Sequence, residues 1–72
     1  MPRPSGRDLA RALERGGFLL HRVRGDHASY YNPASDRATT VPLTNRTLPA
    51  GTIAKILKDA GLTADDLRSL LE

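Results

Sequence analysis

Hydrophobic positions at the start of the chain follow a helical spacing. Ser5 is a suitable N-cap, and Asp8 three residues later can complete a capping box. Three apolar residues share one side of the helix that follows: Leu9, Ala12 and Leu13. Gly16-Gly17 can end this helix, because one glycine can take the left-handed cap conformation. We therefore predict a helix over residues 6–15, preceded by a loose arm at residues 1–4.

The spacing then changes to alternation, which predicts strands separated by turn residues. Phe18 and Leu20 share one face of the first strand. In the second strand Ala28 and Tyr30 share one face, and three polar or aromatic residues share the other: His27, Ser29 and Tyr31. The expected strands are Phe18–Arg24, His27–Tyr31 and Ala38–Val41, joined by turns at Gly25-Asp26 and Asn32–Asp36. Tight turns of this kind predict an antiparallel meander.

Helical spacing returns after residue 49. Pro49–Thr52 opens a second helix, whose core-facing stripe is Ile53, Ile56, Leu57 and Ala60. Gly61 ends that helix, and Leu62 is placed to pack back on its end. Thr63 then caps a short last helix, with Asp66 completing a capping box. Three leucines form the apolar edge of this last helix: Leu67, Leu70 and Leu71.

The predicted element order is α-β-β-β-α with a C-terminal helical tail at residues 64–72. One face of the sheet is apolar enough to take both main helices, which predicts an α+β two-layer sandwich. Seventy-two residues suffice for one domain only, so we expect residues 1–72 to form a single unit.

Composition narrows the possible chemistry. The chain has no cysteine, which excludes disulfides, thiolate zinc sites and cysteine nucleophiles. A small secreted domain would usually need disulfides, and no apolar run reaches the length of a membrane span, so we expect a cytoplasmic protein. We expect no membrane association and no small-molecule cofactor.

The net charge of +3 is unevenly distributed. Residues 1–46 hold eight arginines against four acidic residues, whereas residues 47–72 hold three cations against four acids. Nine of the eleven cations are arginine, whose planar fork suits phosphate. This balance favours a nucleic acid or an acidic protein as partner, although a solubilising surface charge explains it equally well.

Gly25-Asp26-His27 is the first candidate for chemistry. A histidine after a hairpin turn can meet a substrate and exchange a proton near neutral pH. Cleavage of RNA needs a base for the ribose 2′-hydroxyl and an acid for the leaving 5′-oxygen, and His27 can serve either role. Gly25 would allow a tight turn and a close approach by a nucleotide. The plainer alternative is an ordinary surface histidine.

The residues around His27 extend this hypothesis. Arg22 and Arg24 flank the hairpin and can reach a phosphate held at His27, or they are solvated strand charges. His21 would lie opposite Ser29 if the turn had three residues. We expect it to be a surface residue or a partner contact, with a catalytic role as the second alternative. Two histidines would make half a metal site, so we expect no metal.

Other positive features carry weaker signals. Arg7, Arg11 and Arg15 stack on one helix face, where an anion or solvent alone can cover them. The opening of the second helix suits phosphate, with Lys55 one turn further on, but an ordinary helix start looks the same. Tyr31 can stack on a base, although packing is the simpler role.

With these features in view, the sequence resembles the HicA family of toxins, also described as YcfA-like. The resemblance covers roughly residues 5–63 and includes the family's glycine-x-histidine signature at Gly25–His27, followed by the aromatic Tyr30. The stretches that carry it are Leu13–Phe18, Arg24–Tyr30, Thr40–Pro42, Leu48–Ile53 and Ile56–Leu62.

This resemblance implies a fold like that of double-stranded-RNA-binding domains and an RNA-cleaving toxin that inhibits translation. His27 would be its catalytic residue, and Gly25 part of the motif. The implied partner is a HicB-like antitoxin that covers the active surface. The chain departs from the family at Asp26, where serine is common, and at Leu43-Thr44, where members often carry histidine. Asp26 could favour the charged form of His27 or repel phosphate.

The combined hypothesis is a metal-independent endoribonuclease acting on mRNA. His27 is its acid or base, and RNA is held by Gly25, Arg22, Arg24 and Lys55. Two alternatives stay open at this point. One is a non-catalytic module that binds double-stranded RNA, and the other is a protein-interaction subunit.

Overall fold

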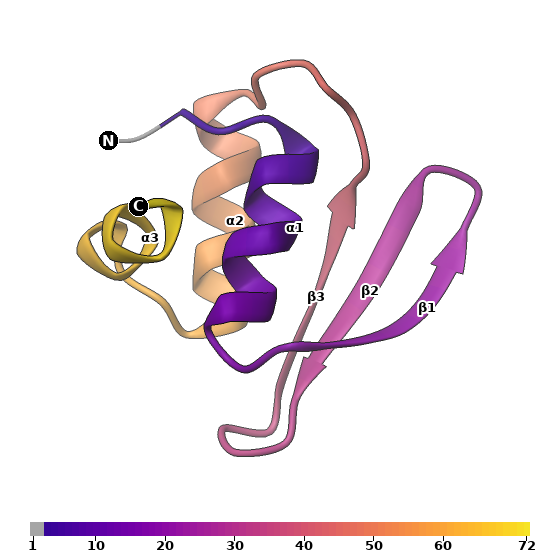
Figure 1. The fold of residues 1–72 in the computed structure, drawn as a ribbon, viewed down its shortest axis with the longest axis vertical. Helices are drawn as coiled ribbons and strands as arrows, with labels where there is room; N and C mark the ends of the chain where they lie inside the picture. Colours follow the sequence, from indigo (N-terminus) through magenta and orange to yellow (C-terminus); the bar gives the residue numbers. More distant parts are fainter. Residues whose placement is uncertain (1–2) are drawn as a thin grey trace.

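A computed structural model describes residues 3–72, and residues 1–2 lie outside the described part. Three helices and three strands follow one another in a simple order (Figure 1). The elements are α1 (Gly6–Arg15), β1 (Leu19–Arg24), β2 (His27–Asn32), β3 (Arg37–Pro42), α2 (Ala50–Ala60) and α3 (Ala64–Leu71). The predicted α+β class and the α-β-β-β-α order with an extra C-terminal helix are confirmed.

The first helix forms where its capping signals predicted. The Ser5 hydroxyl accepts a hydrogen bond from the Asp8 backbone N–H at 3.1 Å. The Asp8 carboxylate also pairs with the Arg11 guanidinium. Hydrogen bonding to Ser5, together with this guanidinium, lowers the pKa of the Asp8 carboxyl. Gly17 follows the helix with φ of 93°, a conformation that costs glycine little. The predicted span of 6–15 is confirmed.

The three strands form one antiparallel sheet in the order β1-β2-β3. In β2 burial alternates, because Ala28 and Tyr30 face the helices while His27, Ser29 and Tyr31 face away. Residues paired across neighbouring strands share a face of the sheet, so the register also assigns the residues of β1 and β3 to one face or the other. We call the helix-covered side the inner face and the opposite side the outer face.

The core lies between the inner face and the two main helices. Val41 and Ala28 are fully buried there, beneath the predicted stripe of α2. Gly61 has φ of 72°, as expected for the end of α2. The capping box at Thr63 and Asp66 is confirmed, and α3 packs on α1 rather than on the sheet.

The helices gather on the β3 side and leave β1 as the far edge of the molecule (Figure 1). Every residue of β1 is exposed. Phe18 is buried, but it precedes the strand, whereas Leu20 is 52% exposed and Val23 is 49% exposed. The prediction that Phe18 and Leu20 share a buried face is therefore wrong for Leu20, because no helix reaches over it.

The expected loose arm is also partly corrected. Pro4 is buried, and its carbonyl accepts a hydrogen bond from the Leu48 N–H at 3.0 Å. Ser5 forms an isolated antiparallel bridge with Thr47. The segment before α1 is thus fastened to the connection between β3 and α2 from Pro4 onward. Met1 and Pro2, the other end of that predicted arm, lie outside the described residues.

Candidate functional site

The β1–β2 turn consists of two residues, Gly25 and Asp26, between the paired residues Arg24 and His27. Gly25 has φ of 61°, and Asp26 is not among the residues with positive φ. A positive φ at the first turn position alone is typical of a type II′ turn, which favours glycine there. Nothing lies within 4 Å of where a Cβ on Gly25 would be, so its backbone conformation selects the glycine.

His27 opens β2 at this turn, and its side chain is 58% exposed. The ring Nδ1 lies 2.8 Å from Oδ1 of Asp26, the residue before it. This contact engages one ring nitrogen and leaves Nε2 available to a ligand. A carboxylate at Nδ1 also orients a histidine ring, which is useful where the other nitrogen must exchange a proton.

Two arginines share the outer face with His27. Arg24 is its direct partner across the hairpin, and Arg22 pairs with Ser29 two residues along β2. Directly paired residues have Cα atoms about 5 Å apart, so long arginine side chains can reach a ligand at the imidazole. Within residues 3–72 neither arginine takes part in an ion pair. We call His27, Arg24 and Arg22 the hairpin patch.

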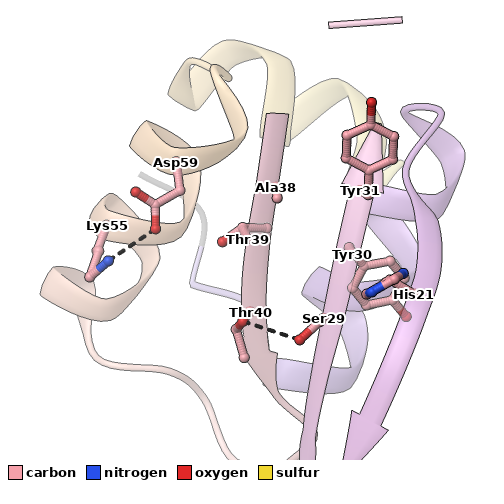
Figure 2. Close-up of a pocket in the computed structure, with 9 residues that line it drawn as sticks. All are labelled: His21, Ser29, Tyr30, Tyr31, Ala38, Thr39, Thr40, Lys55 and Asp59. Atoms are coloured by element: carbon pink, nitrogen blue, oxygen red, sulfur yellow. Dashed lines mark hydrogen bonds and ion pairs between the residues drawn. The ribbon is translucent and has the colours of Figure 1, made fainter. Parts of the chain in front are cut away.

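A groove of about 770 Å³ runs along β2 and β3, and residues of the outer face and of α2 both line it (Figure 2). We call it the sheet groove. Figure 2 shows its floor over β2 and β3, with His21 on one side and Lys55 of α2 on the other. Its lining residues are His21, Ser29, Tyr30, Tyr31, Ala38, Thr39, Thr40, Lys55 and Asp59.

The groove presents hydroxyl groups, two tyrosines, His21 and an ion pair between Lys55 and Asp59. The Ser29 and Thr40 hydroxyl oxygens lie 3.4 Å apart across the strands. The Tyr31 hydroxyl donates to Asp36 at 3.0 Å, and this bond to a carboxylate raises the pKa of Tyr31. Such a surface offers hydrogen bonds and a stacking face to a nucleotide.

The structure brings most of the predicted site residues together, but not all. Gly25, Arg22 and Arg24 surround His27 as expected. Lys55 instead lies across the sheet groove, where its Nζ pairs with Asp59 Oδ2 at 3.0 Å. Any contact between Lys55 and RNA would therefore lie in the groove, away from the turn.

The prediction for His21 is corrected. A β-bulge falls between Leu20 and Arg22, and the turn has two residues rather than three. Arg22, not His21, is the residue opposite Ser29. His21 lines the sheet groove with Ser29, on the same side of the molecule as the hairpin patch.

Sequence reasoning missed the groove as a site. The sequence indicates Tyr31 as a candidate for stacking, but no pattern in it assigns Thr40 or Asp59 to a binding site. Alternation alone places Thr40 beside Ser29 on one face once the strands pair in register. Asp59 carries no such signal, because it reaches the groove through the packing of α2 against β3.

The arginine stripe of α1 is largely occupied by neighbours. Arg11 pairs with Asp8, and Arg15 donates to the Leu70 carbonyl at 2.9 Å, close to the end of α3. Together with Arg3 they line a smaller hollow of about 390 Å³. Arg15 therefore satisfies a helix-terminal carbonyl, which is a structural role.

Two further observations concern the described residues as a whole. Residues 3–72 bring no three histidine, cysteine, aspartate or glutamate side chains together in an arrangement that could hold a metal ion. No helix within that range is long and apolar enough to cross a membrane.

Comparison with known proteins places this architecture in a family. Residues 6–62 match the family described as the HicA toxin of bacterial toxin–antitoxin. The match spans most of the chain, from the first residue of α1 to the residue after Gly61, and includes the hairpin patch. No significant match was found among curated proteins.

The chain therefore belongs to the HicA toxin family. It is the toxin component of a toxin–antitoxin pair, and a cognate antitoxin is its partner. The suspected resemblance is confirmed over nearly the same residues that the sequence motifs indicated.

Proposed function

We propose that this toxin is an endoribonuclease that cleaves mRNA in the cytoplasm and so inhibits translation. The observation that carries the proposal is an exposed His27 whose Nδ1 contacts Asp26 and whose strand partner is Arg24. This arrangement supplies a proton-transfer group beside a cation on one open face. Both promote the breaking of a phosphodiester bond.

The proposed reaction is an attack by the ribose 2′-hydroxyl on the adjacent phosphorus. In one route His27 Nε2 takes the proton of the 2′-hydroxyl as the new P–O bond forms, and water protonates the 5′-oxygen as its bond to phosphorus breaks. In the other route His27 protonates the 5′-oxygen and water accepts the proton of the 2′-hydroxyl. The products are a 2′,3′-cyclic phosphate and a free 5′-hydroxyl. Arg24 and Arg22 stabilise the negative charge that builds up on the phosphate oxygens.

Histidine and arginine suffice for this chemistry, so we propose that it needs no metal ion. Asp26 acts as a positioning residue through the Nδ1 contact. The sheet groove lies on the same face and would take nucleotides next to the cleaved bond. Ser29 and Thr40 offer hydrogen bonds there, Tyr31 a stacking surface, and Lys55 a charge near the backbone of the RNA.

The partner we propose is a HicB-like antitoxin that suppresses cleavage. Membership of the family implies an antitoxin partner. Its binding to the exposed outer face would stop RNA from reaching His27. The amount of bound antitoxin would then set the activity of the toxin.

The decisive experiment is cleavage of a labelled mRNA by the purified chain and by His27→Ala. General acid–base catalysis contributes typically 10²- to 10⁴-fold, so His27→Ala should reduce the rate by at least about 10²-fold. Cleavage should persist in excess EDTA and leave cyclic phosphate ends. Because His27 is exposed, circular dichroism and the melting temperature should change little.

The matched control is His21→Ala, which removes the other histidine from the same side of the sheet. We expect less than about a tenfold loss, because groove contacts affect binding more than proton transfer. A folded His27→Ala protein that cuts at the wild-type rate would reject this function. Salt-dependent RNA binding without fragments would instead support a non-catalytic RNA-binding module.

A further inference from the structure

β1 is an edge strand, and the backbone groups on its free side have no backbone partner in the described part of the chain. β1 pairs with β2 on one side only, and it ends the sheet. Within residues 3–72 no backbone hydrogen bond outside the β1–β2 ladder involves Leu19–Arg24. A free edge of this kind is a template for an added strand, and proteins usually cover or blunt it.

The edge backbone is open at Val23 in particular. Arg24 and His27 flank a two-residue turn, so their backbone groups bond to each other across the hairpin. Hydrogen-bonded and non-bonded pairs alternate along an antiparallel ladder, which makes Val23–Ala28 a non-bonded pair. The N–H and C=O of Val23 therefore point away from β2, toward the free edge.

The side chains of β1 are sorted by face. Val23 and Leu20 pair with the buried Ala28 and Tyr30, so they belong to the inner face, yet both are about half exposed. Arg22 and Arg24 lie on the outer face without an ion pair in the described chain. Near the turn the edge thus presents Val23 on the inner side and Arg22 and Arg24 on the outer side, while the exposed Leu19 lies on the outer side at the far end of the strand.

We infer that an extended segment of the antitoxin adds to β1 as a fourth strand of the sheet. Its side chains should alternate, with apolar residues over Val23 on the inner side and acidic residues beside Arg22 and Arg24 on the outer side. The charge follows from complementarity to a toxin of net charge +3 with unpaired arginines at the edge. This mode of recognition takes affinity from the backbone and specificity from alternate side chains.

The inference rests on membership of a toxin–antitoxin family and not on the ribonuclease proposal. It nevertheless links the two. An acidic segment that engages Arg22 and Arg24 occupies the same guanidinium groups that would hold RNA. Antitoxin binding and RNA binding should then exclude each other even where the antitoxin does not touch His27.

The test compares two substitutions at Val23 in the full chain, with affinity for the purified cognate antitoxin measured by calorimetry. Val23→Pro removes the edge N–H, and an edge position whose N–H faces solvent tolerates proline. Val23→Thr keeps both the N–H and the branched shape. We expect Val23→Pro to weaken binding at least tenfold and Val23→Thr to stay within threefold of wild type.

A second measurement needs no variant. Amide hydrogen exchange of Val23 should be fast in the free toxin and strongly protected in the complex, while exchange at Ala28 should already be slow. Unchanged exchange at Val23 in a saturated complex would overturn the inference. Equal affinity of wild type and a folded Val23→Pro would do the same.

The same kind of experiment distinguishes two other ways in which the β1 edge could be covered. If the toxin alone is a dimer by light scattering and Val23 is protected without antitoxin, a second copy of the chain covers the edge and the inference fails. If Leu20→Ser weakens antitoxin binding while Val23→Pro does not, the partner packs on the exposed apolar side chains of β1 without adding a strand, which also overturns it.

Discussion

The inner face of the sheet has two halves that differ in their cover. On β3 and β2, Val41 and Ala28 are completely buried beneath the helices. On β1, Leu20 and Val23 belong to the same face and are about half exposed. Both halves carry the apolar residues of a core strand, yet only one half is a core. The two main helices dock mainly against β3, at the opposite end of the sheet, so the inner side of β1 remains largely uncovered.

This difference separates stability from interaction within a very small protein. The covered half supplies the burial that holds the fold together. The bare half contributes less to folding and is available to a partner. The chain belongs to a toxin–antitoxin family, and an exposed strand with apolar residues is the kind of surface that a protein partner covers.

The largest expected effect comes from comparing the buried Phe18 with the half-exposed Leu20. Phe18→Ala should lower the free energy of unfolding by about 3–5 kcal/mol, because it leaves a cavity at a fully buried site. Leu20→Ala should cost well under about 1 kcal/mol. Urea unfolding followed by circular dichroism measures both. Equal losses would mean that Leu20 is covered in solution and that the two halves are not distinct.

A smaller effect of opposite sign is expected at Thr39. Its hydroxyl is buried on the covered half and has no hydrogen-bond partner within the described chain. Thr39→Val replaces that hydroxyl with a methyl group and should stabilise the fold by about 1 kcal/mol. The matched control is Thr40→Val on the exposed outer face, which should change stability by less than about 0.5 kcal/mol. Destabilisation by Thr39→Val would show that the hydroxyl is in fact satisfied.

The smallest effect concerns two neighbouring tyrosines on opposite faces. Burial, together with a 2.8 Å hydrogen bond to Glu14 of α1, raises the pKa of Tyr30 to about 12. The folded state therefore holds this proton more tightly than the unfolded state, whose tyrosine ionises near pH 10. The resulting stability is complete below pH 10 and is lost between about pH 10 and 12.

Melting temperatures measured across that range should fall less steeply for Tyr30→Phe than for wild type. Tyr31→Phe is the control, because Tyr31 is exposed and its raised pKa comes from a surface hydrogen bond to Asp36. Its pH profile should nearly match that of wild type. Identical slopes for Tyr30→Phe and wild type would show that the Glu14 contact does not persist in solution.

Local signals explain how much of the fold could be predicted. Ser5 and Thr63 caps, the glycine at Gly61 and the α2 stripe act over three to four residues, so their outcome does not depend on distant parts of the chain. The alternation in β2 was also correct, because both faces of a central strand meet a defined environment. Each of these elements formed at or within a residue of its expected bounds.

The errors fall where a long-range arrangement decides the result. Whether Leu20 is buried depends on the reach of helices that follow or precede it by many residues. The bulge at His21 changes which residues oppose each other, and no local signal marked it. The packing of α2 likewise decides that Lys55 lies in the groove beside Asp59, and its contact with RNA stays a prediction.

Local signals in the chain are enough to predict the helices, the turns, the order of the strands and the histidine that follows a glycine turn. Each depends on capping, spacing and backbone preferences of adjacent residues. Tertiary structure alone decided which apolar strand stays uncovered and which cations share a face with His27. Those outcomes depend on strand register and on where the two main helices dock on the sheet, and both arise from contacts between residues far apart in the chain.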